Sequence, residues 1–139
     1  MTRGRLLALA GLALAVLAVP ATAKAPKRPH VAFKGFTVYS PGAATKTKPG
    51  GTVKLCVNPG ELLARGTVHG AIKHQSYQET WYLNGKKTDR FTISWAKKGT
   101  YSDSWSLTDA HGFRNGTWTL KLTRKGKLIG RESLKLSCR

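Results

Sequence analysis

The stretch GTWTLKLTRKGKLIGRESLKLSCR, residues 116–139, closes the chain and carries the pattern that decides its fold. Trp118, Leu120 and Leu122 alternate with Thr and Lys, so they fall on one side of an extended segment while the polar residues fall on the other. A second alternating segment follows the turn signal Lys125-Gly126. The stretch therefore predicts two neighbouring strands with one face in a core and the other in solvent.

The same β pattern extends back through the chain to residue 31. Short segments rich in β-branched and aromatic residues are separated by turn signals, of which Asn84-Gly85 is the strongest indication of a hairpin. None of them has a helical period. These features predict an antiparallel sandwich or barrel, and the predicted strands are residues 31–40, 51–57, 77–83, 90–95, 100–107, 116–122 and 128–136.

Alternation within the strands also assigns side chains to the core. It predicts that the tryptophans pack inside rather than form a platform for a ligand. Glu79 lies at a core position between Tyr77 and Trp81, which indicates either a buried carboxylate paired with Lys or Arg, or a position exposed by a twist or a sheet edge. In two strands the residues predicted to point inward are Phe91, Ile93, Trp95, Tyr101, Trp105 and Leu107.

Residues 1–23 have the features of a secretory signal peptide. Arg3 and Arg5 precede an apolar run of about 14 residues, shorter than the roughly 20 that a membrane-spanning helix needs. Small residues end the segment, so we expect cleavage near Ala23. A retained membrane anchor is the alternative. The signal peptide predicts a secreted, periplasmic or cell-surface protein.

The remaining chain suits one domain. Residues 24–30 combine prolines with basic side chains and offer little to bury, so they predict a basic, flexible N-terminal tether. Residues 31–139 contain all of the predicted strands and form a single β-sandwich domain in this interpretation.

The protein is strongly basic, with 24 Lys and Arg against 6 Asp and Glu. Without Arg3 and Arg5 the counts become 22 and 6, a net charge of +16 with His neutral. Such an excess predicts salt-sensitive attraction to anionic partners such as envelope polymers, lipid head groups or extracellular nucleic acid. A charge that only keeps a secreted protein soluble is the alternative.

Cys56 and Cys138 are the only cysteines, and in an oxidising compartment they predict one intramolecular disulfide. Two cysteines offer too few ligands for structural zinc. However, seven strands running up and down in turn would place them at opposite ends of the sandwich, roughly 25 Å apart at ~3.3 Å per residue. A disulfide needs Cα atoms within about 7 Å, so either the cysteines do not pair within one molecule or the chain reverses once more between them.

Residues 61–73, ELLARGTVHGAIK, are where we expect that reversal, as an added strand or a crossing connection. The glycines within it weaken its strand signal. A second conflict remains, because alternation turns Cys56 away from the side that Leu136 and Cys138 share. A bulge near Gly130 or beside Cys56 would repair it.

With this reversal, the turns at the end of the sandwich opposite the disulfide become basic. Loop tips on a rigid scaffold commonly bind ligands, so the sequence predicts an anion-binding end there, with Glu61, Asp89 and Asp109 at the cysteine end. Lysines that serve solubility and discourage edge pairing are the alternative. The candidate anion-binding residues are Lys46, Lys48, Lys73, Lys97, Lys98, Arg124, Lys125 and Lys127.

Two segments resemble secreted bacterial immunoglobulin-like β-sandwich domains. Residues 116–137 are similar to the closing hairpin of such domains, and WYLNGKK, residues 81–87, to an earlier hairpin. The resemblance implies an immunoglobulin-like antiparallel β-sandwich of seven to eight strands that acts as a non-catalytic binding or structural module. The cysteine placement departs from the antibody pattern of two cysteines around a core Trp. The matching residues are Gly116, Trp118, Gly126, Lys127, Leu128 and Gly130.

No catalytic constellation stands out in the sequence. Asp109 and His111 flank a turn in which Asp and Gly have ordinary turn roles, and the histidines His30, His69, His74 and His111 are too scattered to predict a metal site. We expect a monomer that is not an enzyme, binds no cofactor and carries no nucleic-acid-binding motif. A cationic inhibitor or antimicrobial protein and, less favoured, a hydrolase are the alternatives to a module that binds an anionic envelope polymer.

Overall fold

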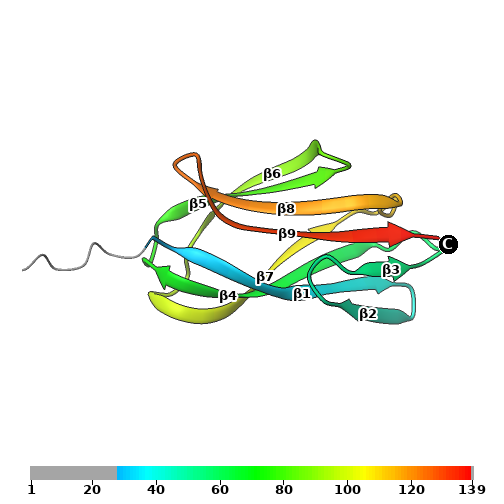
Figure 1. The fold of residues 1–139 in the computed structure, drawn as a ribbon, viewed down its shortest axis with the longest axis horizontal. Coiled ribbons are helices and arrows are strands. Elements are labelled where there is room, and N and C mark those ends of the chain that lie inside the picture. Colours follow the sequence, from blue (N-terminus) through cyan, green and yellow to red (C-terminus); the bar gives the residue numbers. More distant parts are fainter. Residues whose placement is uncertain (1–27, 139) are drawn as a thin grey trace, which may run out of the picture.

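The computed structural model describes residues 28–138, which form two β-sheets packed face to face (Figure 1). Sheet A has the strand order β2-β1-β4-β7, and sheet B has the order β3-β9-β8-β5-β6. Residues 28–138 contain no helix that is long and apolar enough to cross a membrane. The strands are β1 His30–Ser40, β2 Ala43–Thr47, β3 Thr52–Lys54, β4 Glu61–Ala71, β5 Ser76–Leu83, β6 Lys86–Ser94, β7 Gly99–Thr108, β8 Gly116–Arg124 and β9 Lys127–Ser137. The predicted signal peptide and residues 24–27 of the predicted tether lie outside the described residues.

The order of the strands is that of an immunoglobulin-like sandwich. In sheet A, β1, β4 and β7 take the places of strands A, B and E, and in sheet B, β5, β6, β8 and β9 take those of C, C′, F and G. Residues 95–98 alone join β6 to β7, which leaves no room for a D strand. The predicted fold is confirmed, but the described part of the chain has nine strands rather than seven to eight.

Two short strands correct the prediction. The sequence pattern does not indicate β2, whose residues AATKT are mostly polar, yet β2 pairs with the second half of β1 at the edge of sheet A. The chain then crosses to sheet B, where β3 pairs with β9 in parallel and Val53 lies opposite Leu136. The ladder between β3 and β9 departs from the antiparallel sandwich that the sequence predicts, while the other ladders of the described strands are antiparallel.

The expected reversal is β4, which confirms the added strand in residues 61–73. Leu62, Ala64 and Val68 point inward and are fully buried. Gly66 is required by close packing, because a Cβ there would lie 2.9 Å from the backbone oxygen of Ala32 on β1. With β4 in place, the sequence-distant cysteines meet at one end of the sandwich.

Cys56 and Cys138 form the predicted disulfide, with 4.3 Å between their Cα atoms. Cys56 lies beyond the end of β3, where the chain bends and no longer pairs with β9. Alternation along β3 therefore does not decide the direction of the Cys56 side chain, and the conflict disappears. A bulge does occur beside Gly130, since Ile129 has no partner in the ladder between β8 and β9. Unlike the antibody disulfide, this one joins neighbouring segments at one edge of sheet B.

All four tryptophans belong to the core, as the sequence predicts. Trp81 on β5 is completely buried, and its ring centroid lies 6.4 Å from that of Phe36 on β1 in the facing sheet. The prediction for Phe91 is wrong, because its side chain is 43% exposed. Its strand, β6, is the edge of the five-stranded sheet, where the opposite sheet ends at β7 and covers it only in part.

Candidate functional site

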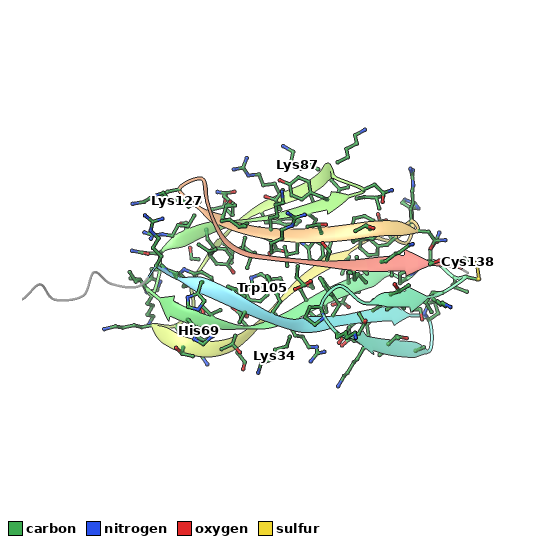
Figure 2. The ribbon with its side chains drawn as sticks, in the orientation of Figure 1. Lys34, His69, Lys87, Trp105, Lys127 and Cys138 are labelled. Atoms are coloured by element: carbon green, nitrogen blue, oxygen red, sulfur yellow. A yellow bond between two sulfur atoms is a disulfide. The ribbon has the colours of Figure 1, made fainter. Side chains whose placement is uncertain are left out.

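The two ends of the sandwich differ in charge. The basic pole is defined here as residues 28–30, 69–75, 95–98 and 124–127, and the disulfide pole as residues 41–42, 55–60, 84–85, 109–115 and 138. None of the basic-pole segments contains Asp or Glu. Figure 2 shows Lys127 and His69 at the end of the molecule opposite Cys138. The Lys and Arg residues of the basic pole are Arg28, Lys73, Lys97, Lys98, Arg124, Lys125 and Lys127.

The hairpin between β8 and β9 forms one half of the basic pole. Arg124 and Lys127 are the last pair of the ladder and lie directly opposite each other, with Lys125 and Gly126 as the turn between them. Arg28 and the buried Pro29 pack beside this hairpin, and together these residues line a groove of about 160 Å³. The groove is large enough for one small oxyanion and has cations as its only ionisable lining residues.

The other half of the pole consists of two connections that are tied together. The backbone N–H of His74 donates to the oxygen of Trp95 at 2.9 Å, and that of Trp95 donates to the oxygen of Gln75 at 3.0 Å. These bonds hold the loop containing Lys73 next to the loop containing Lys97 and Lys98. All three lysines are exposed, and the ammonium of Lys97 lies 5.9 Å from the centre of the Tyr101 ring.

Lys46 and Lys48 do not lie at the basic pole, which corrects their expected placement. Lys46 pairs with Thr37 on β1, and Thr37 pairs in turn with Leu63 near the start of β4, in the half of the sandwich nearer the disulfide. Lys48 follows directly in the connection to sheet B. Because β2 is only five residues long, its hairpin with β1 does not extend to the far end of the molecule.

Sequence reasoning missed Arg28 and the histidines as members of the basic pole. Arg28 was assigned to the tether, whereas Pro29 is buried and β1 begins at His30. His30 and His69 are cross-strand partners on β1 and β4, with ring centroids 4.7 Å apart. The sequence shows only that each histidine lies near the end of a strand. It indicates that the two are neighbours only if the pairing of β1 with β4 is already known.

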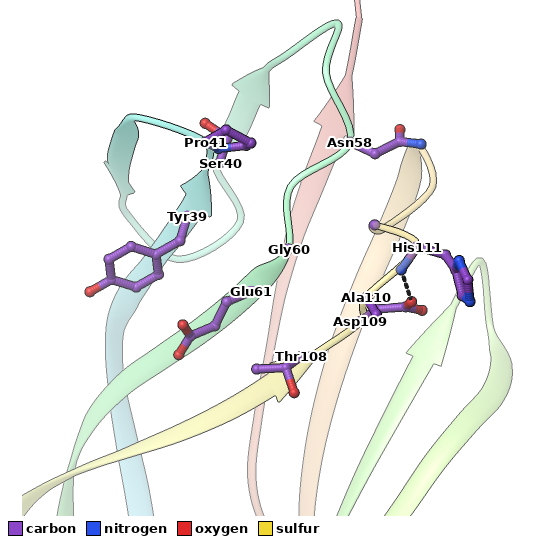
Figure 3. A pocket seen from close by; sticks show the side chains of 11 residues that line it. Tyr39, Ser40, Pro41, Asn58, Gly60, Glu61, Thr108, Asp109, Ala110 and His111 are labelled. Atoms are coloured by element: carbon purple, nitrogen blue, oxygen red, sulfur yellow. Dashed lines mark hydrogen bonds between the residues drawn. The ribbon is translucent and has the colours of Figure 1, made fainter.

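The disulfide pole has a shallow hollow of about 450 Å³ between the start of β4 and the loop after β7 (Figure 3). Asp109 accepts a hydrogen bond from the backbone N–H of His111 at 2.8 Å, which is the turn role that the sequence predicts. The ring of His111 points away from Glu61 (Figure 3). These side chains therefore do not form an acid and base pair around a common point.

A second groove, of about 560 Å³, lies between the edge strands β6 and β7. Glu79 at its base is 3% exposed, and its carboxylate accepts a hydrogen bond from the indole N–H of Trp81 at 2.7 Å. Burial raises the pKa of Glu79, the hydrogen bond from Trp81 opposes this, and the charge of Asp103 raises the pKa further. Within residues 28–138 no group of three His, Cys, Asp or Glu side chains is placed to hold a metal ion.

The indole rings of the other three tryptophans make hydrogen bonds or stacking contacts inside the fold. The indole N–H of Trp105 donates to the hydroxyl of Tyr77 at 2.8 Å, and that of Trp118 donates to the backbone oxygen of Arg114 at 2.9 Å. Trp95 stacks on Tyr77 with 3.9 Å between the ring centroids. Buried rings held in this way pack the core and present no aromatic surface to a ligand.

No protein-family model and no curated protein sequence matches the chain. Among solved structures, an immunoglobulin-like protein from Pseudomonas aeruginosa aligns with 81% of this chain and 98% of its own, at 13% sequence identity and a TM-score of 0.47. The CARDB domain of a Pyrococcus furiosus protein, determined in complex with di-metal ions, aligns with 80% of this chain and 94% of its own, at 13% identity and a TM-score of 0.42. Likenesses at these TM-scores and identities assign neither a family nor a ligand to this chain.

Proposed function

We propose that this protein is a secreted, non-catalytic binding module that holds an anionic cell-envelope polymer at its basic pole. The observation that carries the proposal is the convergence of cations from four separate segments, without an acidic residue among them, on one end of a rigid sandwich. The disulfide is consistent with the oxidising compartments in which such a module would work.

The hairpin at the basic pole carries charges that do not favour folding. Like charges directly opposite each other on neighbouring strands are destabilising, and Arg124 and Lys127 are such a pair. Lys125 and Gly126 both have positive φ, 49° and 75°, as in a type I′ turn, where Asn-Gly is the preferred sequence. The hairpin at the disulfide pole has that sequence, Asn84-Gly85, with φ of 48° and 80°. A bound anion would offset the repulsion at the basic pole.

The ligand would be a polymer with repeated anionic groups rather than a small molecule. The groove beside Arg28 accommodates only a small oxyanion, while the other cations of the pole lie in the two connections between the sheets. Successive anionic groups of one chain could contact these cations in turn. Each contact is exposed and weak in physiological salt, where charges are screened beyond about 8 Å, so affinity would depend on their number.

The test compares two triple variants that remove the same charge from opposite ends. The pole variant is Arg124→Gln, Lys125→Asn and Lys127→Gln, in which Asn suits the positive φ of the turn. The matched control is Lys54→Gln, Lys86→Gln and Lys87→Gln, which are exposed residues toward the disulfide pole. Binding is measured as retention on an isolated cell-wall preparation while the salt concentration is raised.

We expect the pole variant to be released at a clearly lower salt concentration than the control variant. Release of both variants at the same concentration would mean that the net charge alone determines retention, and the proposal would then be wrong. Thermal unfolding of each variant confirms that the fold is intact before binding is compared.

A further inference from the structure

We propose that His30 and His69, at the end of the outer face of sheet A, and His74, in the loop after β4, form part of the anion-binding surface of the basic pole, and that they add positive charge to it as the pH falls. This inference rests on the proposed function. It adds binding residues that the sequence did not suggest, and it gives the same site a dependence on pH.

The first observation is where the histidines lie. His30 begins β1 and follows directly after Arg28 and Pro29, which line the groove at the hairpin. His74 lies in the loop that is hydrogen-bonded to the connection containing Lys97 and Lys98. His30 and His69 therefore lie near both halves of the pole and His74 belongs to one of them, whereas His111 lies at the disulfide pole.

The second observation is the local backbone, which departs from regular β structure at two of these residues. Between Val68 and Ala71 the ladder from β4 to β7 shifts register, so that His69 and Gly70 form a bulge. Bulges bend a strand and redirect its side chains, and they often occur next to binding sites. His74 has a φ of 69°, an uncommon conformation for a residue other than glycine.

The third observation is the stacked pair of rings. His30 and His69 are stacked with 14° between their planes. The nearest acidic residue in the ladder between β4 and β7 is Asp103, which pairs with Gly66. Asp103 alternates with the outward-facing serines of β7 and is half-buried, so it lies on the inner face, and the outer surroundings of the pair are basic. The other charged or titratable groups on β1, β4, β7 and the connections beside them are Arg28, Lys34, Tyr39, Glu61, Arg65, Lys73, His74, Lys97, Lys98, Tyr101 and Asp103, of which Glu61 lies at the opposite end of β4.

These surroundings couple protonation to binding. Imidazole groups gain charge as the pH falls through the range just below neutrality. Two charged rings in this stack repel each other, and an anion at their exposed edges relieves that repulsion. The bound protein should therefore take up protons that the free protein does not, and each linked proton changes the affinity by up to about tenfold per pH unit.

The test measures the dissociation constant for dextran sulfate at pH 7.5 and pH 5.5, because sulfate esters keep the same charge at both values. The variant His30→Gln with His69→Gln removes the stacked pair, and His74→Asn tests the loop with a residue that tolerates positive φ. His111→Gln is the matched control at the other end of the molecule. All of these side chains are exposed or half-exposed, and thermal unfolding checks the fold of each variant.

We expect the unmodified protein and His111→Gln to bind at least several-fold more tightly at pH 5.5 than at pH 7.5. The double variant should lose most of the increase between pH 7.5 and pH 5.5, and His74→Asn should lose part of it. An increase that survives in the double variant, or no increase in the unmodified protein, would overturn the inference. Failure to bind at either pH would instead overturn the proposed function.

Discussion

At the scale of single residues, Glu79 is the side chain least suited to its surroundings. The sequence allows two interpretations of this residue, burial with a cationic partner or exposure at an edge, and the structure matches neither. The carboxylate is buried, and its hydrogen-bond partner is the indole of Trp81. Even in so basic a protein, no Lys or Arg among residues 28–138 is placed to form an ion pair with it, because the cations lie on outer faces and at the ends.

This arrangement predicts a dependence of stability on pH. Because the pKa of Glu79 is raised in the folded protein, between about 4.5 and that raised value the folded protein binds a proton that the unfolded chain has released. The contribution of Glu79 to stability is thus complete below about pH 4.5 and is lost as the pH rises through the folded pKa. Glu79→Gln keeps an oxygen that accepts from Trp81 and removes the titration.

We therefore expect Glu79→Gln to be at least as stable as the unmodified protein at pH 7 and to flatten the decline in stability from pH 4.5 to pH 7. Urea unfolding across this range measures both effects. Glu132→Gln, which replaces a half-buried carboxylate bonded to the next backbone N–H, is the control. A profile for Glu79→Gln that follows the control would contradict the prediction.

At the scale of elements, the bulge in β1 decides how the edge of sheet A is built. The register with β4 shifts between Phe33 and Gly35, and Gly35 has a φ of 141°. A Cβ at Gly35 would overlap the backbone oxygen of Thr47 at the end of β2. The bulge thus lets β2 and the connection after it lie close against β1, and β2 itself has too little apolar surface to be indicated by pattern alone.

Gly35→Ala should accordingly destabilise the protein more than Gly42→Ala. Both glycines have positive φ, but a Cβ at Gly42 meets nothing within 4 Å. We expect roughly 1 to 3 kcal/mol from the strained backbone at either site, with an added penalty at Gly35 from the overlap with β2. The free energy of unfolding in urea compares the two, and equal losses would mean that the contact with β2 contributes nothing.

At the scale of the whole molecule, the disulfide and the basic pole occupy opposite ends. The bond joins the segment after β3 to the end of β9, next to the parallel ladder, and so ties the first third of the domain to its last strand. One long side of the sandwich is closed where Val31 and Phe33 approach Gly130 of β9. The other long side stays open between β6 and β7, where Phe91 is exposed.

Removing the disulfide should therefore lower stability without changing the basic pole. The cysteines are separated by 82 residues, and the chain-entropy model assigns roughly 4 to 5 kcal/mol to a link of this length. Cys56→Ser with Cys138→Ser should unfold at a correspondingly lower urea concentration. At temperatures where the variant is folded, its release from the cell-wall preparation should occur at the same salt concentration as before, and a shift in release would show that the two ends are coupled.

The local features of this protein follow from its sequence alone. Alternation of side chains identified seven of the nine strands and the inward-facing tryptophans, Asn84-Gly85 marked a hairpin, and the geometry of a disulfide required the reversal that β4 provides. These inferences succeed because strand period, turn chemistry and the reach of a disulfide depend on a few neighbouring residues or one fixed distance.

Which segments lie side by side depends on the folded arrangement of the whole chain. It placed β3 parallel to β9, left Phe91 at an uncovered edge, moved Lys46 and Lys48 away from the basic pole and brought Arg28, His30 and His69 to it. Pairing partners, sheet edges and the ends of a sandwich arise from contacts between residues far apart in the chain, and a pattern that repeats every two residues contains no information about them.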